Sequence, residues 1–158
     1  MSPFVDVVTE SPLWSALPGA KDVARRAVEA ALAEAGRPYK SDAELAVILS
    51  DDSRVKTLND IWRGKDRPTN VLSFPAAEGA EIATAELLGD VVLAFETIAE
   101  EAKAGGKTLD AHLAHLVVHG TLHLFGFDHI EDGEAEAMEN AERAALRRLG
   151  IADPYTES

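Results

Sequence analysis

The chain has no cysteine among its 158 residues. This absence excludes a disulfide scaffold and argues against a purely structural zinc site, because such sites usually include cysteine ligands. No apolar run approaches the length of a membrane span, and the N-terminus does not combine a basic segment with an apolar one. We therefore expect a cytoplasmic protein with no membrane partner.

Basic residues are also scarce, since 15 Lys and Arg stand against 28 Asp and Glu, for a formal net charge of -13. Taken alone, this charge argues against non-specific nucleic-acid binding. Positions 54–67 nevertheless hold five basic residues, namely Arg54, Lys56, Arg63, Lys65 and Arg67. Many of these belong to a solvated helix face or loop. The stretch 63–69, however, reads as a basic loop between a helix and a strand, where binding residues commonly lie.

The hydrophobic pattern predicts an α+β fold. Strands are expected over residues 4–8, 43–49, 71–74 and 87–94. Helices are expected over residues 20–35, from Ser50 or Asp51 to about 62, and over 96–104, 109–125 and 131–149. Val55, Leu58 and either Ile61 or Trp62 would form the buried side of the second helix. Residues 76–85 read as a mobile loop.

These elements predict one small mixed sheet of about four strands covered by about five helices. Residues 1–158 would form a single domain, since the length suits one full-sized core. We expect the helix over 109–125 to be central and packed on the sheet. Its histidine stripe (His112, His115, His119 and His123) would then open into a cleft, with His112 itself solvated.

The stretch 119–129 reads His-Gly-Thr-Leu-His-Leu-Phe-Gly-Phe-Asp-His. His119 and His123 are four residues apart, so their rings share one helix face. Gly126 can adopt a left-handed conformation and end the helix, which allows the chain to bring His129 back toward them. Three converging imidazoles predict an open site for one zinc ion with a fourth position left for water. The alternative is a cluster of core histidines.

The same spacing fits the metzincin protease pattern with one departure, because Gly120 stands where that pattern has glutamate. That glutamate is the general base of a zinc protease. A zinc hydrolase of a peptide or small amide therefore remains an alternative only if another carboxylate enters from a loop. A metal ion beside an arginine that binds phosphate is instead a combination suited to the cleavage of phosphodiester bonds.

Three segments resemble the bacterial YbeY family of single-domain zinc-dependent endoribonucleases, which are linked to rRNA maturation and ribosome quality control. They are residues 58–75 (LNDIWRGKDRPTNVLSFP), 88–93 (LGDVVL) and 115–129 (HLVVHGTLHLFGFDH). The likeness spans most of residues 45–145. It implies that His119, His123 and His129 are the zinc ligands. It also implies that Arg63 faces the metal cleft and takes part in catalysis.

The resemblance further implies single-stranded RNA, notably rRNA, as substrate, and the ribosome or its associated proteins as partners. We expect a monomer. A third hypothesis is a ribosome-associated binding module in which the metal only stabilises the fold. Two interpretations stay open for His115, as a packing residue or a contact of the site, and two for Asp128, which could orient a ligand imidazole or stabilise a turn. The acidic stretch 131–142 is either a face for a basic protein or a solvated helix face.

Overall fold

The structure is a computed structural model that describes residues 4–128 and 132–155. Its strands are β1 (Phe4–Thr9), β2 (Glu44–Ser50), β3 (Val71–Pro75) and β4 (Leu87–Ala94). Its α-helices are α1 (Ala20–Ala35), α2 (Asp52–Arg63), α3 (Phe95–Ala104), α4 (Leu109–Leu124) and α5 (Asp132–Arg148). Two 3-10 helices, η1 (Pro12–Ala16) and η2 (Gly79–Thr84), lie in the connections. The predicted α+β class is confirmed.

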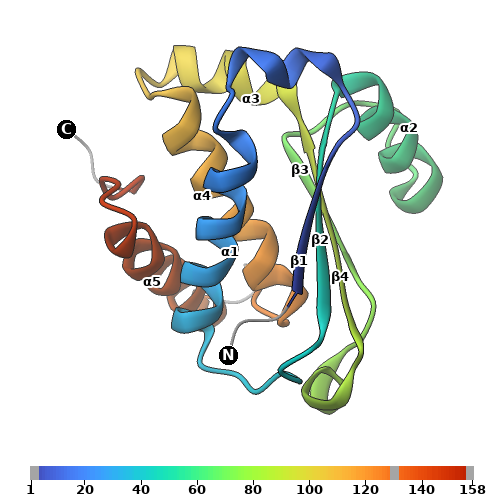
Figure 1. Ribbon diagram of the computed structural model, residues 1–158, viewed down its shortest axis with the longest axis vertical. Helices are drawn as coiled ribbons and strands as arrows, with labels where there is room; N and C mark the ends of the chain where they lie inside the picture. The colour runs from blue at the N-terminus through green and yellow to red at the C-terminus, as the bar shows by residue number, and fades with distance from the viewer. Residues whose placement is uncertain (1–3, 129–131, 156–158) are drawn as a thin grey trace.

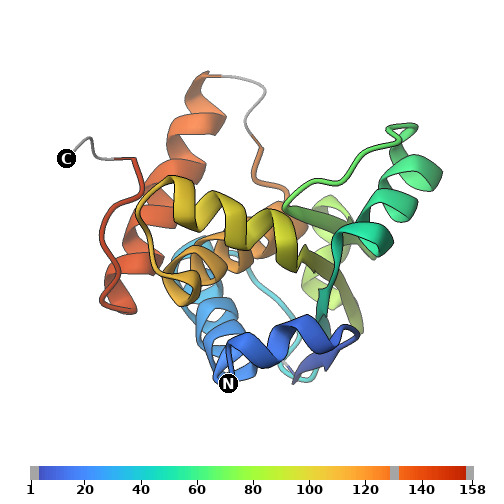
Figure 2. The same cartoon turned by 90° about the horizontal axis from the view of Figure 1, so that it is seen from above.

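The four strands form one mixed sheet in the order β1-β2-β4-β3. β1, β2 and β4 are parallel, whereas β3 runs antiparallel to β4 at the edge of the sheet. Helices α1 and α4 cover one face, with α5 outside them, and α2 lies on the other side (Figures 1 and 2). The edge strand β3 therefore borders both α4 and α2, and the cleft described below opens there.

Helix α4 is the central element of the larger core, as predicted. Thr108 caps its N-terminus by accepting a hydrogen bond from the backbone N–H of Ala111 at 3.3 Å. Gly126 follows its C-terminus with φ of 88°, the left-handed conformation expected from the sequence. Gly120 faces the sheet, since a Cβ there would lie 2.6 Å from Val91 Cγ1 and 3.0 Å from Ser73 Oγ. The absence of a side chain at Gly120 thus lets α4 approach β3 and β4 closely.

A second, smaller core lies beneath α2 and consists of Val55, Leu72, Val92 and Ala94. It reaches only the earlier turns of the helix. Ile61 and Trp62 in the last turn are consequently 65% and 68% exposed. The expectation that one of these two residues faces inward is therefore wrong.

The loop expected over residues 76–85 contains η2, and Ile82 within it is buried against the larger core. A further expectation fails, because His112 is not solvated. It is 8% exposed, and its Nε2 lies 2.9 Å from Glu101 Oε1. Burial lowers the pKa of His112, and the contact with Glu101 opposes that shift only in part.

Within residues 4–128 and 132–155, none of the helices has the length and apolar character required to cross a membrane.

Candidate active site

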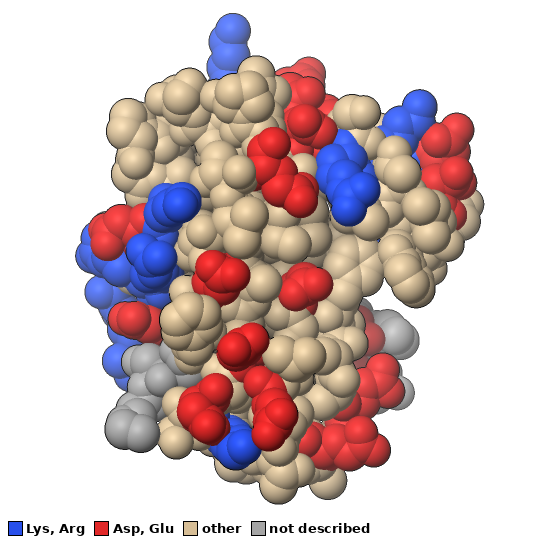
Figure 3. All heavy atoms as spheres, turned by 45° about the vertical axis from the view of Figure 1, so that its right-hand side comes forward, with Lys and Arg blue, Asp and Glu red and all other residues tan. Residues whose placement is uncertain are grey.

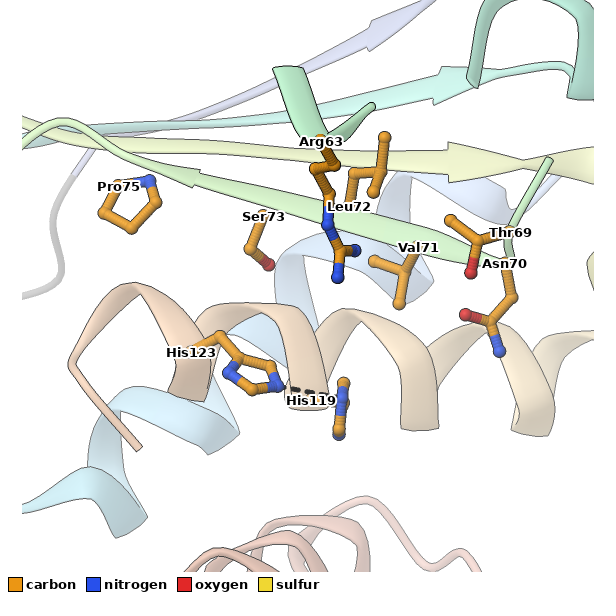
Figure 4. A pocket seen from close by; sticks show the side chains of 9 residues that line it. All are labelled: Arg63, Thr69, Asn70, Val71, Leu72, Ser73, Pro75, His119 and His123. Atoms are coloured by element: carbon orange, nitrogen blue, oxygen red, sulfur yellow. Dashed lines mark hydrogen bonds between the residues drawn. The ribbon is translucent and has the colours of Figure 1, made fainter. Parts of the chain in front are cut away.

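A cleft of about 390 Å³ lies between α4 and the edge strand β3, below the end of α2 (Figure 4). Its lining combines residues from the histidine helix, the edge strand and the loop that joins α2 to β3. The described residues that line it are Arg63, Thr69, Asn70, Val71, Leu72, Ser73, Pro75, His119 and His123. Two predicted metal ligands and the predicted catalytic arginine therefore share one cavity.

His119 and His123 face each other within this cleft. Their Nε2 atoms are 3.1 Å apart (Figure 4). Two nitrogens held at about 2.0–2.1 Å by a tetrahedral zinc ion would lie about 3.4 Å apart. The pair therefore has nearly the separation that one bound ion requires, and the predicted convergence of these two rings is confirmed.

Glu142 on α5 contacts the ring nitrogen of His119 that does not face His123. Its side chain is completely buried, and its Oε1 accepts a hydrogen bond from His119 Nδ1 at 2.9 Å. Because an ionised carboxylate can only accept, Nδ1 of His119 is the donor in this hydrogen bond, and Nε2 is the ring nitrogen that faces His123 in the cleft. A metal-bound histidine commonly has such a partner on its other nitrogen. The carboxylate thus prepares His119 to bind a cation.

The second oxygen of Glu142 is also fully engaged. Oε2 accepts hydrogen bonds from His115 Nε2 at 2.8 Å and from the Tyr155 hydroxyl. Burial by itself raises the pKa of Glu142, but these hydrogen bonds and the one from His119 hold it well below its ordinary value. Burial and the adjacent carboxylate raise the pKa of Tyr155, which keeps its hydroxyl protonated. Glu142 is therefore a charged, saturated acceptor rather than a free base.

Glu142 is not among the site residues predicted from the sequence, where it belongs to the acidic stretch 131–142 that is expected to be a surface. That assignment is wrong at Glu142. The available signal was periodicity, because Met138, Ala145 and Leu146 are buried and Glu142 falls on the same helical stripe. An acidic residue within an apolar stripe indicates a buried partner. His115, left open between packing and site contact, reaches the site through this shared carboxylate.

Arg63 is the last residue of α2, and its guanidinium points across β3 toward the two imidazoles (Figure 4). Gly64 follows with φ of 68° and ends the helix, so the chain turns into the basic loop immediately after Arg63. The buried Asn59 fastens this loop by donating from Nδ2 to the carbonyl of Arg67 at 2.8 Å. Arg63 is thereby presented from a defined helix end.

Arg63 has no acidic partner in the described part of the chain, where none of the ion pairs includes it. The nine described residues that line the cleft also include no carboxylate. The guanidinium fork therefore remains available for an anionic ligand, and planar forks of this kind match phosphate well.

The third predicted ligand, His129, lies outside the described residues. Within those residues, no group of three or more His, Cys, Asp or Glu side chains is arranged to hold a metal ion. The three-histidine site accordingly stays a prediction. Asp128 lines a cavity that adjoins the cleft and shares Pro75 and His123 with it.

Two observations bear on the peptidase alternative. A glutamate at position 120 would have to enter the space occupied by Val91 and Ser73, because even a Cβ comes within 3.0 Å of both side chains. A carboxylate from a loop would have to replace it, and none stands among the nine described residues that line the cleft. The hydrolase of a peptide or small amide is therefore not favoured.

These features define an α+β protein whose central helix presents two facing imidazoles to Arg63 across an open cleft, and Arg63 forms no ion pair with any described residue. The chain belongs to the Endoribonuclease YbeY family, whose model matches residues 16–150. It is accordingly an endoribonuclease, an enzyme that acts on RNA phosphodiester bonds.

Curated relatives support this membership over nearly the whole chain. An Endoribonuclease YbeY from Azorhizobium caulinodans is 56% identical over 151 residues, which cover 96% of this chain and 95% of the relative. One from Rhodopseudomonas palustris (strain CGA009) is 51% identical over 155 residues, or 97% and 81% of the two chains. The solution structure of TM1509 from Thermotoga maritima matches with a TM-score of 0.56 and 25% identity, covering 98% of this chain and all of that one.

Proposed function

We propose that this endoribonuclease is zinc-dependent and cleaves single-stranded RNA, with His119, His123 and His129 holding one ion and Arg63 binding the scissile phosphate. The observation that carries the proposal is the facing pair of His119 and His123 Nε2 atoms, 3.1 Å apart, in the cleft that Arg63 also lines. Neutral imidazoles suit zinc, and three of them leave a coordination position open.

The protein side chains prepare the cleft for phosphodiester cleavage. A zinc ion bound there would supply Lewis acidity and a nucleophile near neutral pH. Glu142 accepts the Nδ1 proton of His119, which would leave Nε2 as the nitrogen that holds the ion. Arg63 draws the RNA phosphate into the cleft and stabilises the charge that develops on its oxygens.

We further propose that the natural substrate is rRNA and that the enzyme works in rRNA processing and ribosome quality control in the cytoplasm. The likeness of residues 58–75 and 115–129 to the YbeY family supports this substrate class. Partners would be the ribosome or its associated proteins, with the chain acting as a monomer and folding as one domain. A binding module with a merely stabilising metal is a weaker proposal, since it gives the unpaired Arg63 no role.

The test combines metal analysis with cleavage of an unstructured RNA by the wild type, His119→Ala, Arg63→Ala and Arg54→Ala. We expect His119→Ala to lose both metal and cleavage, and Arg63→Ala to retain metal while cleavage falls by at least about 100-fold, as for loss of a donor that stabilises transition-state charge. Arg54→Ala, an exposed arginine at the other end of α2, serves as the control and should behave as the wild type. Wild-type cleavage by Arg63→Ala, with contaminating nuclease excluded, would refute the assignment of Arg63 as the residue that binds the scissile phosphate.

A further inference from the structure

Trp62 is a large aromatic side chain that is exposed to solvent and stands next in the chain to Arg63. It is 68% exposed, whereas the chain's other tryptophan, Trp14, is only 3% exposed. It directly precedes Arg63, which lines the cleft. An exposed indole next in sequence to a residue of the cleft has apolar surface available for a ligand.

The indole of Trp62 packs against the edge strand β3. Its ring centroid lies 6.3 Å from that of Phe74 on β3, with an angle of 62° between the ring planes. This edge-on contact orients the indole without covering it, as the high exposure shows. Trp62 also stands on a helix that is capped at Asp51 and tied to its following loop by Asn59. The capped helix and the contact with Phe74 thus hold the indole ring in a defined position.

The surroundings of Trp62 favour an anionic ligand. Arg63, Lys65 and Arg67 follow it within five positions and are exposed, and no ion pair among the described residues involves them. Elsewhere the chain is strongly acidic, and Figure 3 shows acidic side chains scattered over one face while basic ones gather in a few groups. An exposed ring beside unpaired cations matches a nucleotide, which has a flat base and a phosphate.

We propose that Trp62 is a stacking platform for an unpaired base of the RNA substrate, next to the phosphate that Arg63 binds. The position of that phosphate rests on the proposed function. Every base has a π-face, so the platform accepts many sequences. A base within a duplex is already stacked on both sides, whereas an unpaired base can be splayed onto a protein ring. The platform therefore selects single-stranded RNA.

Fluorescence provides a direct test, because the two tryptophans differ so strongly in exposure. Titrating the intact protein with a short oligo(U) or oligo(A) RNA should quench the emission of Trp62 while the buried Trp14 stays unaffected. Trp62→Phe should retain binding, measured by anisotropy of a labelled oligonucleotide, but lose the quenching. Full quenching in Trp62→Phe would place the base elsewhere and overturn the proposal.

Affinity provides the second test. Trp62→Ala should weaken oligonucleotide binding by roughly 5- to 100-fold, as loss of one stacked base predicts, and Trp62→Tyr should restore most of it. Ile61→Ala, at an equally exposed neighbouring position, and Phe4→Ala, an exposed ring on the opposite edge strand, should stay within about twofold of the wild type. If Ile61→Ala weakens binding as much as Trp62→Ala, the surface is a general apolar contact and the stacking proposal fails.

An oligonucleotide with one abasic position locates the stacked base. At that position, base removal should weaken wild-type binding and have no further effect on Trp62→Ala. The two proposals can fail separately. If Arg63→Ala abolishes cleavage but Trp62→Ala binds RNA normally, only the platform is refuted. If Trp62→Ala weakens binding but Arg63→Ala cleaves normally, only the assignment of the phosphate site is refuted.

Discussion

Glu142 joins two histidines of α4 through its two carboxylate oxygens, one for His119 and one for His115. It is completely buried, so each hydrogen bond replaces solvent that the charge has lost. The resulting arrangement fixes which nitrogen of His119 carries a proton. At the scale of one residue, the proposed binding of a cation in the cleft would depend on a side chain that is not among the described lining residues.

The substitution Glu142→Gln tests this dependence. One carboxylate oxygen is replaced by an amide nitrogen that cannot accept, so at least one of the donors from His115, His119 and Tyr155 loses its partner. We expect the zinc affinity to fall by about 10–100-fold, measured by competition with a chromophoric chelator. The free energy of unfolding should fall by about 1–3 kcal/mol in urea titrations.

The matched control for that substitution is Glu136→Gln, on an exposed position of the same helix. It should leave both the zinc affinity and the unfolding transition within error of the wild type. Wild-type zinc affinity in Glu142→Gln would show that the carboxylate is a structural group without influence on the metal site.

At the scale of elements, the site depends on how closely α4 approaches the sheet. Gly120 permits the approach, and Ser73 on β3 secures it by donating a hydrogen bond to the Gly120 carbonyl at 2.9 Å. Among the described strands β3 is paired with β4 alone, so its outer border stays open beside the cleft. The geometry of the cleft therefore depends on how closely α4 packs against the sheet.

The substitution Gly120→Ala should disturb the packing of α4 against the sheet. The new Cβ would meet Val91 Cγ1 at 2.6 Å, so strand or helix must shift. The overpacking should cost about 1–3 kcal/mol, and alanine gains roughly 1 kcal/mol over glycine in helix propensity, so we expect a net loss of up to about 2 kcal/mol in the free energy of unfolding. Cleavage should also weaken, since a displaced α4 moves His119 relative to Arg63.

Gly133→Ala in α5 is the control, because a Cβ there meets nothing within 4 Å. Its stability should equal or slightly exceed that of the wild type in the same urea titration. If Gly120→Ala proves as stable as Gly133→Ala, the conclusion that α4 needs a glycine to pack closely on the sheet would be wrong.

At the scale of the whole molecule, charge is distributed unevenly. The net charge of -13 opposes indiscriminate contact with RNA, while the exposed cations of the loop after α2 attract a few phosphates. Binding should therefore depend on few ionic contacts. The logarithm of the binding constant for single-stranded RNA should fall with the logarithm of salt concentration with a slope of about -1 to -2.

Removing one loop cation should reduce that slope. Lys65→Ala should lower its magnitude by about 0.7, the value for one phosphate contact of a single strand, whereas the exposed Arg25→Ala on α1 should not change it. The measurement is a series of anisotropy titrations over a range of potassium chloride concentrations. A slope far steeper than about -2 would indicate a much larger basic surface than this loop.

The sequence by itself determined what depends on local spacing. Residues four apart on a helix share a face, so the meeting of His119 and His123 could be read from their numbers alone. Glycine tolerates the left-handed conformation, so the ends of α2 and α4 could be read from Gly64 and Gly126 in the same way. The alternation of apolar stretches likewise predicted the α+β class.

Only the tertiary structure decided which distant residues meet. Glu142 reaches His119 across 23 positions, and His112 is buried against Glu101, because α4 packs against α5 and α3 in one specific way. Trp62 is exposed because the second core ends before the last turn of α2. Local periodicity states that a face is apolar or polar, but the packing of whole elements determines which neighbour that face receives.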